Sequence, residues 1–410
     1  MAEQKKQKMQ FLVILTIVFL AFIGISMPYL IFPALFLNPS YSILPVGEGA
    51  SNQALFLGIT LAAYPLGQFI GSPILGALSD DYGRKPLLSG SLAISALCNL
   101  LTGFAIEQHY LGLLIISRFT AGLMEGNIAI ARAMAADITT ISKHETFGKI
   151  NATASIAFLV GPLLGALMAD KSLWESLTTA TPFYSIAILF FCLSLLSLLL
   201  LEKTVIRTPT KVQTFWQRIH LIKRMSVLFS NKHLQFLMII STCFTLAVDI
   251  FYEFGPVHLT IQWALAPVQL IIYNGVLCLG LAAGNGWLPT LLSKHISNRL
   301  AILSSIGGFT LCLIGVVLTK STFLMITLFG LSGLAIGLAV TLLTVNISNS
   351  IPDTIQGEVM GTQVSLRVLG DAIICLFGGT LLLLSSKLIL IAAAIMCACA
   401  TIYYGRAKTA

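Results

Sequence analysis

Apolar segments of about 20 residues recur along the chain, and they constrain its fold more than any other feature. A helix of about 20 residues crosses the roughly 30 Å hydrocarbon core of a bilayer. Because lipid offers the backbone no hydrogen-bond partner, such a segment must be a helix or part of a closed barrel, and non-alternating apolar runs favour the helix. The sequence therefore predicts an all-α membrane protein.

Composition agrees with this prediction. The chain has 410 residues, of which 57% are hydrophobic and 10% charged, whereas about 25% are charged in soluble domains. Its net charge is +8, but lysine and arginine are spread among loops, so we expect no nucleic-acid partner. All eight cysteines fall in apolar runs without metal-type spacing, which favours small packing residues and predicts no metal or cofactor.

We expect twelve membrane-spanning helices in two six-helix halves. The halves cover residues 1–201 and 234–410, and a basic cytoplasmic linker over residues 202–233 joins them. The expected spans are 11–33, 54–77, 86–106, 112–136, 149–169, 182–201, 234–258, 268–292, 299–318, 323–349, 359–384 and 388–404.

Loop charges predict the orientation. Most lysines and arginines fall on one side of the membrane, and only Lys171, Lys320 and Lys387 fall on the other. Cytoplasmic loops carry the basic excess, so we expect both termini in the cytoplasm. The short loops favour a bacterial inner membrane.

An internal repeat predicts that the two halves are pseudo-symmetric. A shift of 213 residues places Gly67 on Gly280 and Gly71 on Gly284. The same shift places Gly165 on Gly378. Repeated six-helix halves with a site near the midplane are typical of secondary transporters.

A charged turn that contains two glycines separates the second and third spans. Its charges place it at the membrane surface, in contact with water. We expect Gly83 to supply a backbone conformation with positive φ and Gly76 to allow close helix approach. The spaced pattern Gly-x-Leu-x-Asp-x-x-Gly-Arg-Lys resembles the loop between helices 2 and 3 of the major facilitator superfamily of secondary transporters. The residues that carry this resemblance are Gly76, Asp80, Gly83, Arg84 and Lys85.

The resemblance implies a twelve-helix fold that works by alternating access. It also implies a conformational latch at the cytoplasmic face. There Arg84 would pair with Asp137 at the end of helix 4, and Asp80 would meet the amino end of helix 11, where the helix dipole favours negative charge.

Helix 4, the fourth expected span (112–136), carries three ionisable residues inside the membrane, where each needs a partner or an aqueous cavity. Arg118, Glu125 and Arg132 are seven residues apart and so share one helix face. The stretch 118–126 resembles a second motif of the family, whose arginine is associated with proton coupling. The alternative is that Glu125 and Arg132 only neutralise each other.

Helix 7 carries Asp249 and Glu253, four residues apart on one face. Two carboxyl groups this close repel when both are ionised, which favours a proton on one of them. We prefer Asp249 as the proton carrier because it lies near the middle of the span. The alternative for Glu253, together with His258, is a hydrated position in the outer vestibule.

Helix 11 carries Arg367 and Asp371, again four residues apart. They form either a self-neutralising pair along the helix or a pair that faces the transport pathway or helix 2. Six further polar residues could supply hydrogen bonds, although each is more often a helix-packing residue than a ligand contact. They are Tyr64, Gln68, Asn127, Tyr252, Tyr273 and Asn274.

Helix 5 contains Gly161-Pro162-Leu-Leu-Gly165-Ala166. This stretch resembles a third motif of the family, often found in proton-driven exporters, which bends the helix and permits close packing. Ala166 stands where the family has a glycine, so the match is partial. The alternative is a packing kink that carries no information about direction.

We expect a monomeric transporter that exports a small amphipathic compound in exchange for protons, with the proton gradient as its energy source. The first alternative is a proton-driven importer of an anionic metabolite or a carboxylate-type siderophore, because Arg118, Arg132 and Arg367 suit carboxylates. The second is a transport-dead receptor on the same fold. The sequence contains no nucleophile elbow, phosphate loop or metal cluster, so we do not expect an enzyme.

Overall fold

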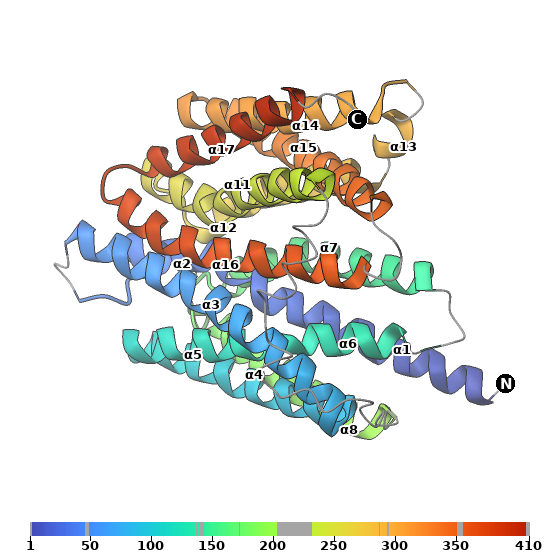
Figure 1. Ribbon diagram of the computed structural model, residues 1–410. Coiled ribbons are helices and arrows are strands. Elements are labelled where there is room, and N and C mark those ends of the chain that lie inside the picture. Colours follow the sequence, from blue (N-terminus) through green and yellow to red (C-terminus); the bar gives the residue numbers. More distant parts are fainter. Residues whose placement is uncertain are drawn as a thin grey trace. The chain divides into compact units, whose positions relative to one another are not determined.

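The computed structural model of the chain is all-helical (Figure 1). It describes residues 2–45, 49–136, 138, 143–171, 173–202, 232–286, 288–292, 295–350 and 356–406. The first eight helices are α1 (Ala2–Ser26), α2 (Pro28–Leu37), α3 (Ala50–Tyr82), α4 (Arg84–Glu107), α5 (Leu111–Leu123), α6 (Gly126–Ala136), α7 (Lys143–Met168) and α8 (Thr181–Leu200). The later ones are α11 (Lys232–Trp263), α12 (Pro267–Gly286), α13 (Leu288–Leu292), α14 (Asn298–Leu318), α15 (Thr322–Asn349), α16 (Gln356–Leu382) and α17 (Ser386–Arg406).

The helices confirm the predicted all-α membrane fold. Within the described residues, 11 helical segments are long and apolar enough to cross a membrane. The apolar part of α7, Ala152–Met168, is shorter and coincides with the predicted fifth span. Twelve helical segments therefore correspond to the twelve predicted spans.

Three predicted spans consist of two helices each. The first span breaks at Met27, because Pro28 has no N–H group to continue the hydrogen bonds of α1, although Met27 itself keeps helical angles (φ −55°, ψ −40°). The fourth breaks at Met124 and Glu125, between α5 and α6. The eighth consists of α12 and the short α13. The sequence analysis had treated all three as single helices.

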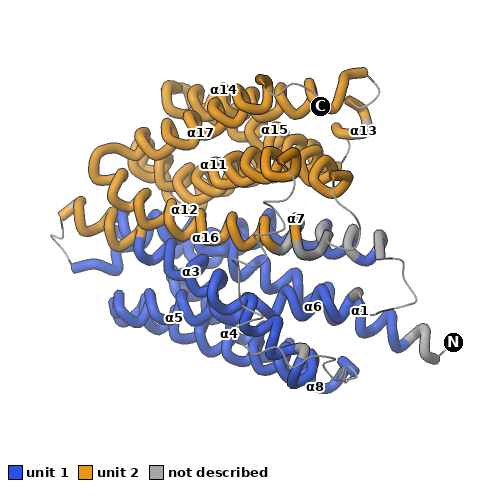
Figure 2. The backbone as a smooth tube through the Cα atoms, viewed as in Figure 1, with its two compact units in different colours: residues 1–48, 59–220 blue, residues 49–58, 221–410 orange. Residues whose placement is uncertain are grey.

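The chain forms two compact units (Figure 2), which cover residues 1–48 with 59–220, and residues 49–58 with 221–410. Residues 50–58 of α3 belong to the second unit, where a Cβ on Gly58 would lie 2.6 Å from the Cα of Gly379 in α16. The predicted linker over residues 202–233 lies almost wholly outside the described residues, so its boundaries stay a prediction.

In the first unit, glycines let α3 and α5 cross with their backbones in contact. A Cβ on Gly67 would lie 2.1 Å from the carbonyl oxygen of Phe119, and one on Gly71 would lie 2.0 Å from that of Leu123. Real side chains do not come this close, so both positions require glycine.

The second unit repeats this crossing between α12 and α15. A Cβ on Gly280 would lie 2.1 Å from the carbonyl oxygen of Gly330, and one on Gly284 would lie 2.3 Å from that of Leu334. These are the two glycines that the 213-residue shift pairs with Gly67 and Gly71. The internal repeat is thus a repeat of backbone contacts between helices.

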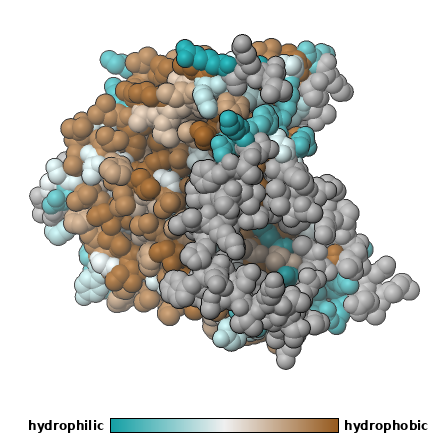
Figure 3. Space-filling model, viewed as in Figure 1, coloured by the Kyte–Doolittle hydropathy of each residue, from teal (hydrophilic) through white to brown (hydrophobic). Residues whose placement is uncertain are grey.

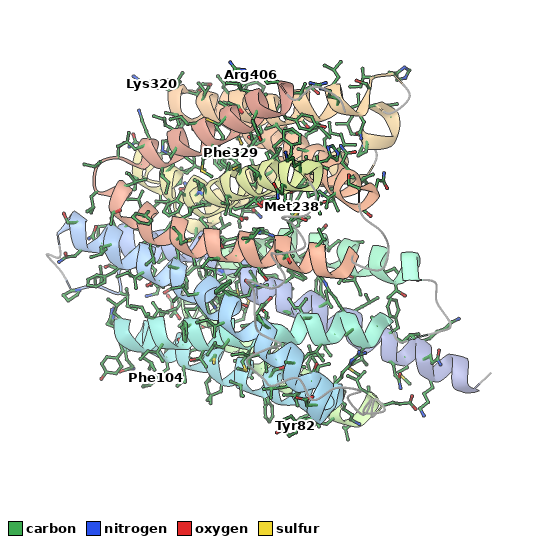
Figure 4. The ribbon with its side chains drawn as sticks, viewed as in Figure 1. Tyr82, Phe104, Met238, Lys320, Phe329 and Arg406 are labelled. Atoms are coloured by element: carbon green, nitrogen blue, oxygen red, sulfur yellow. The ribbon has the colours of Figure 1, made fainter. Side chains whose placement is uncertain are left out.

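The surface suits lipid contact. Figure 3 shows a broad, continuous area of hydrophobic residues with hydrophilic residues at its margins. Large apolar side chains such as Phe323, Leu199 and Leu311 are mostly exposed, and a bilayer would cover them. The charged residues Lys320 and Arg406, labelled in Figure 4, lie at opposite ends of the helices of the second unit.

Candidate functional site

Each unit contains a buried polar cluster within its membrane-spanning helices. The cluster of the first unit surrounds the break between α5 and α6. There the backbone N–H of Glu125 bonds the Gly122 carbonyl at 3.0 Å, and the N–H of Ile128 bonds the Glu125 carbonyl at 3.1 Å. These bonds join residues three apart, so the chain tightens into a 3₁₀-like turn, a feature that often marks a functional hinge.

Glu125 is 5% exposed and interacts with residues from three helices. The hydroxyl of Tyr64 in α3 donates a hydrogen bond to Glu125 Oε2. Arg118 of α5 and Arg132 of α6 both interact electrostatically with the Glu125 carboxyl group. Asn127, also buried, follows in the first turn of α6.

Arg118 is 3% exposed and lies over two aromatic rings. Its guanidinium carbon is 4.6 Å from the centroid of the Tyr64 ring and 5.6 Å from that of Phe32. Such contacts attract a cation to the negative ring face, most strongly where water is excluded.

The three charged residues of helix 4 thus gather as the sequence analysis predicted, although on two helices rather than one. Tyr64 was predicted as a possible hydrogen-bonding residue, but not as the partner of Glu125. Its position one turn from Gly67, in the helix that packs on α5, is the signal that could have pointed to it.

The cluster of the second unit joins α11 and α16. Arg367 donates two parallel hydrogen bonds to Asp249, from Nε to Oδ2 and from Nη2 to Oδ1, each 2.8 Å long. Asp249 is 6% exposed, whereas the Arg367 side chain is 48% exposed. This bidentate geometry is the strong form of an arginine–carboxylate pair.

Two other carboxyl groups lie beside this pair. Ligand atoms of Glu253, Asp371 and Cys375 all lie within 4.8 Å of one another. The Cys375 thiol donates to Asp371 Oδ1 at 3.9 Å. One thiol and two carboxylates could hold a metal ion, and the two carboxyl groups alone could share a proton.

The structure therefore changes two expectations about these helices. Arg367 forms its hydrogen-bonded ion pair with Asp249 of another helix rather than with Asp371 on its own. The hydrated alternative for Glu253 and His258 was wrong, because they are only 6% and 2% exposed. His258 Nδ1 lies 3.1 Å from Ser386 Oγ at the start of α17.

The predicted polar residues Tyr252, Tyr273 and Asn274 of the second unit interact with neighbouring side chains. The Tyr273 ring meets Phe329 edge to face at 5.4 Å (Phe329 is labelled in Figure 4). The Cys278 thiol donates to Asn274 Oδ1 at 4.0 Å, and Tyr252 interacts electrostatically with Asp249. Their predicted role as hydrogen-bond partners of a substrate stays a prediction.

The charged turn between α3 and α4 agrees with the predictions in part. Gly83 has φ 93° and ψ 144°, which confirms its positive φ. Arg84 Nη1 donates to the Ala133 carbonyl at 2.9 Å, four residues before Asp137. No described residue comes within 4 Å of a Cβ placed on Gly76, so the close helix approach expected there stays a prediction.

The latch itself stays a prediction. Asp137 lies outside the described residues, and so does the side chain of Asp80, whose backbone lies near the end of α3. Lys85 lies in the first turn of α4 and is partly exposed.

The helix 5 motif packs α7 against the break between α1 and α2. A Cβ on Gly161 would lie 2.2 Å from Ser26 Oγ, and one on Gly165 would lie 2.6 Å from Met27 Cγ. Pro162 lies inside α7 between them. Close packing therefore explains both glycines. A role of this motif in the exchange of substrate for protons stays a prediction.

Sequence comparisons place these features among known proteins. The Major Facilitator Superfamily matches residues 14–375. The tetracycline resistance protein, class H, of Pasteurella multocida is 29% identical over 368 residues, which are 87% of this chain and 84% of that protein. Multidrug resistance protein 2 of Bacillus subtilis is 31% identical over 166 residues, which are 40% of this chain and 38% of that protein.

Solved structures share the fold. The human organic anion transporter MFSD10 matches with a TM-score of 0.69 and 19% identity, over 97% of this chain and 99% of that one. The nucleoside transporter NupG matches with a TM-score of 0.75 and 14% identity, over 97% of this chain and 99% of that one. At such identities the likeness concerns the fold alone.

Proposed function

Because this chain belongs to the Major Facilitator Superfamily of secondary transporters, we propose that it exports small amphipathic compounds in exchange for protons. The names of two relatives support export: one confers tetracycline resistance and the other multidrug resistance. A membrane transporter protects a cell most directly by moving the toxic compound out.

The observation that carries the proposal is the carboxyl pair of Glu253, which is buried, and Asp371, which is partly buried, beside the Asp249–Arg367 ion pair. Two carboxylates within 4.8 Å inside a membrane repel strongly, so one proton shared between them is favourable. Arg367 already compensates the charge of Asp249. We therefore assign the exchangeable proton to Glu253 and Asp371, in place of the Asp249 that the sequence favoured.

In this mechanism the pair takes up a proton from outside and releases it to the cytoplasm. Release leaves a net negative charge, which attracts a cationic or amphipathic substrate from the inner side. Glu125 is a second carboxyl group that could exchange a proton, with Arg118 and Arg132 near it. Exchange of one proton for a monovalent cation moves no net charge across the membrane, whereas exchange of one proton for a neutral compound moves one positive charge inward.

The loop charges support an orientation with both termini in the cytoplasm, in the inner membrane of a bacterium. Reporter fusions to each terminus, one active only inside and one only outside, test this orientation.

Proteoliposomes with an imposed pH gradient test the function. The screen includes tetracycline, lipophilic cations and polycarboxylates, with wild type beside Asp371→Asn and the loop variant Asp170→Asn as a control. The proposal expects lipophilic compounds to move against protons in wild type and Asp170→Asn, and Asp371→Asn to lose this coupling. Wild-type protein that is well folded and couples no compound to protons would contradict the proposal and favour a receptor.

One observation supports a second candidate, a proton-driven carrier of organic anions. The half-exposed side chain of Arg367 suits a carboxylate ligand. Protons that move with polycarboxylates in the same assay would favour this candidate. The relatives named above give no support to a siderophore substrate, and we do not propose one.

A further inference from the structure

Tyr64 connects Arg118 and Glu125, two oppositely charged residues of the first unit. Its hydroxyl donates to Glu125 Oε2, and its ring face carries the Arg118 guanidinium at 4.6 Å from the centroid. A cation over a phenol ring draws electron density from it and makes the O–H a stronger donor. Arg118 therefore acts on Glu125 partly through this side chain.

Backbone packing holds Tyr64 in place relative to Glu125. A Cβ on Gly122 would lie 2.1 Å from the Tyr64 carbonyl oxygen, and one on Gly126 would lie 2.6 Å from Leu75 Cβ, also in α3. Glycines thus press α3 against the chain on both sides of Glu125. The backbone of Tyr64 is therefore held close to the chain around Glu125.

The carboxyl group keeps one oxygen available for a proton. Glu125 Oε1 is buried and accepts no hydrogen bond from the described part of the chain. A proton can therefore bind Oε1 while Tyr64 continues to donate to Oε2. Loss of that proton strengthens the bond from Tyr64, because a charged acceptor binds a hydroxyl more strongly than a neutral one.

Among the described residues, few other charged or titratable groups lie near Glu125 and Tyr64. Arg118 of α5 and Arg132 of α6 also act on Glu125, and Cys98 of α4 acts on Tyr64. The membrane parts of α1 and α7, residues 9–26 and 152–168, also pack near α6 and contain no ionisable residue.

We propose that Tyr64 is a positioning residue that sets the pH at which Glu125 exchanges its proton, by stabilising the ionised carboxylate through a hydroxyl polarised by Arg118. The inference deepens the proposed function, since it names the control on one of its proton groups. It concerns the titration of Glu125 and can be tested without any substrate.

Infrared titration of the full-length protein in lipid tests the inference. The carboxyl C=O band to follow is the one that Glu125→Gln removes. Without the Tyr64 hydroxyl the ionised form is less stable, so Tyr64→Phe raises the midpoint of this band by about one pH unit or more. Tyr184→Phe is the matched control, because it removes a tyrosine–glutamate bond of 2.8 Å to Glu107 in the same unit.

An unchanged midpoint in Tyr64→Phe, or a Glu125 band that does not titrate while the protein stays folded, would overturn the inference. If Tyr64→Phe fails to fold, 2,3-difluorotyrosine at position 64 keeps the ring and donates more strongly, so the midpoint must fall. A rise there would show an effect of packing alone and would also overturn it. None of these outcomes depends on transport, so a failure of the exporter proposal is distinguished by the proteoliposome assay.

Discussion

Arg367 in α16 pairs with Asp249 in α11 through two hydrogen bonds of 2.8 Å, although Asp371 lies one turn away on its own helix. The pair ties together two helices of the second unit and leaves Asp371 next to Glu253. This ion pair between helices is the reason why we assign the exchangeable proton to Glu253 and Asp371.

Removal of the Arg367 charge should destabilise the protein. Arg367→Gln leaves Asp249 buried and without its cation, which we expect to destabilise the fold by about 1–3 kcal/mol. Thermal unfolding in detergent measures the effect as a lower melting temperature. Asp249→Asn combined with Arg367→Gln should recover much of the loss, because no buried charge is left alone.

Arg406→Gln is the matched control for this prediction, since it removes an exposed arginine at the end of α17. Equal melting temperatures for Arg367→Gln and Arg406→Gln would contradict a stabilising role for the pair.

The glycine crossings should respond alike in the two units. Gly71→Ala and Gly284→Ala each place a Cβ within 2.3 Å of a carbonyl oxygen, so the helices must move apart, and we expect a loss of about 1–3 kcal/mol. Gly90→Ala in α4 meets no atom of the described residues within 4 Å and should be neutral or slightly stabilising. Melting temperatures of the three variants test this, and a stable Gly284→Ala would argue against equivalent crossings.

The charged turn should depend on Gly83 more than on Gly76 for its backbone. At φ 93° and ψ 144°, alanine is strained, and Gly83→Ala should destabilise the protein by about 1–3 kcal/mol. Gly76→Ala adds a methyl group where no described residue lies within 4 Å, so its melting temperature should stay near that of wild type. Equal effects of the two substitutions would show that the turn conformation does not matter for stability.

Glu253 and Asp371 should couple proton movement to transport, and they should not be needed for substrate binding. Glu253→Gln and Asp371→Asn should both abolish transport driven by a pH gradient and keep counterflow, in which labelled substrate exchanges with unlabelled substrate across the membrane. Glu107→Gln, at the end of α4, should keep both activities. Loss of counterflow in both pair variants, with the protein folded, would place the pair in substrate binding instead.

The sequence by itself determined the features that follow from local chemistry. A run of apolar residues must be helical in lipid wherever it lies, so the spans could be counted before any contact was known. The positive φ of Gly83 was likewise predictable, because the glycine stands in a tight turn between two helices. The 213-residue repeat also anticipated the paired glycine crossings, since the same backbone contact needs the same missing side chain.

Only the tertiary structure decided which ionisable residues meet. Spacing along a helix shows which residues share a face, but it does not show which neighbouring helix that face meets. From the sequence, Arg367 could therefore be paired with Asp371 but not with Asp249, and Tyr64 could be named as a hydrogen-bonding residue but not as the donor to Glu125. Both partners depend on how the helices are rotated and packed, and the glycine contacts that set this packing involve residues far apart in the chain.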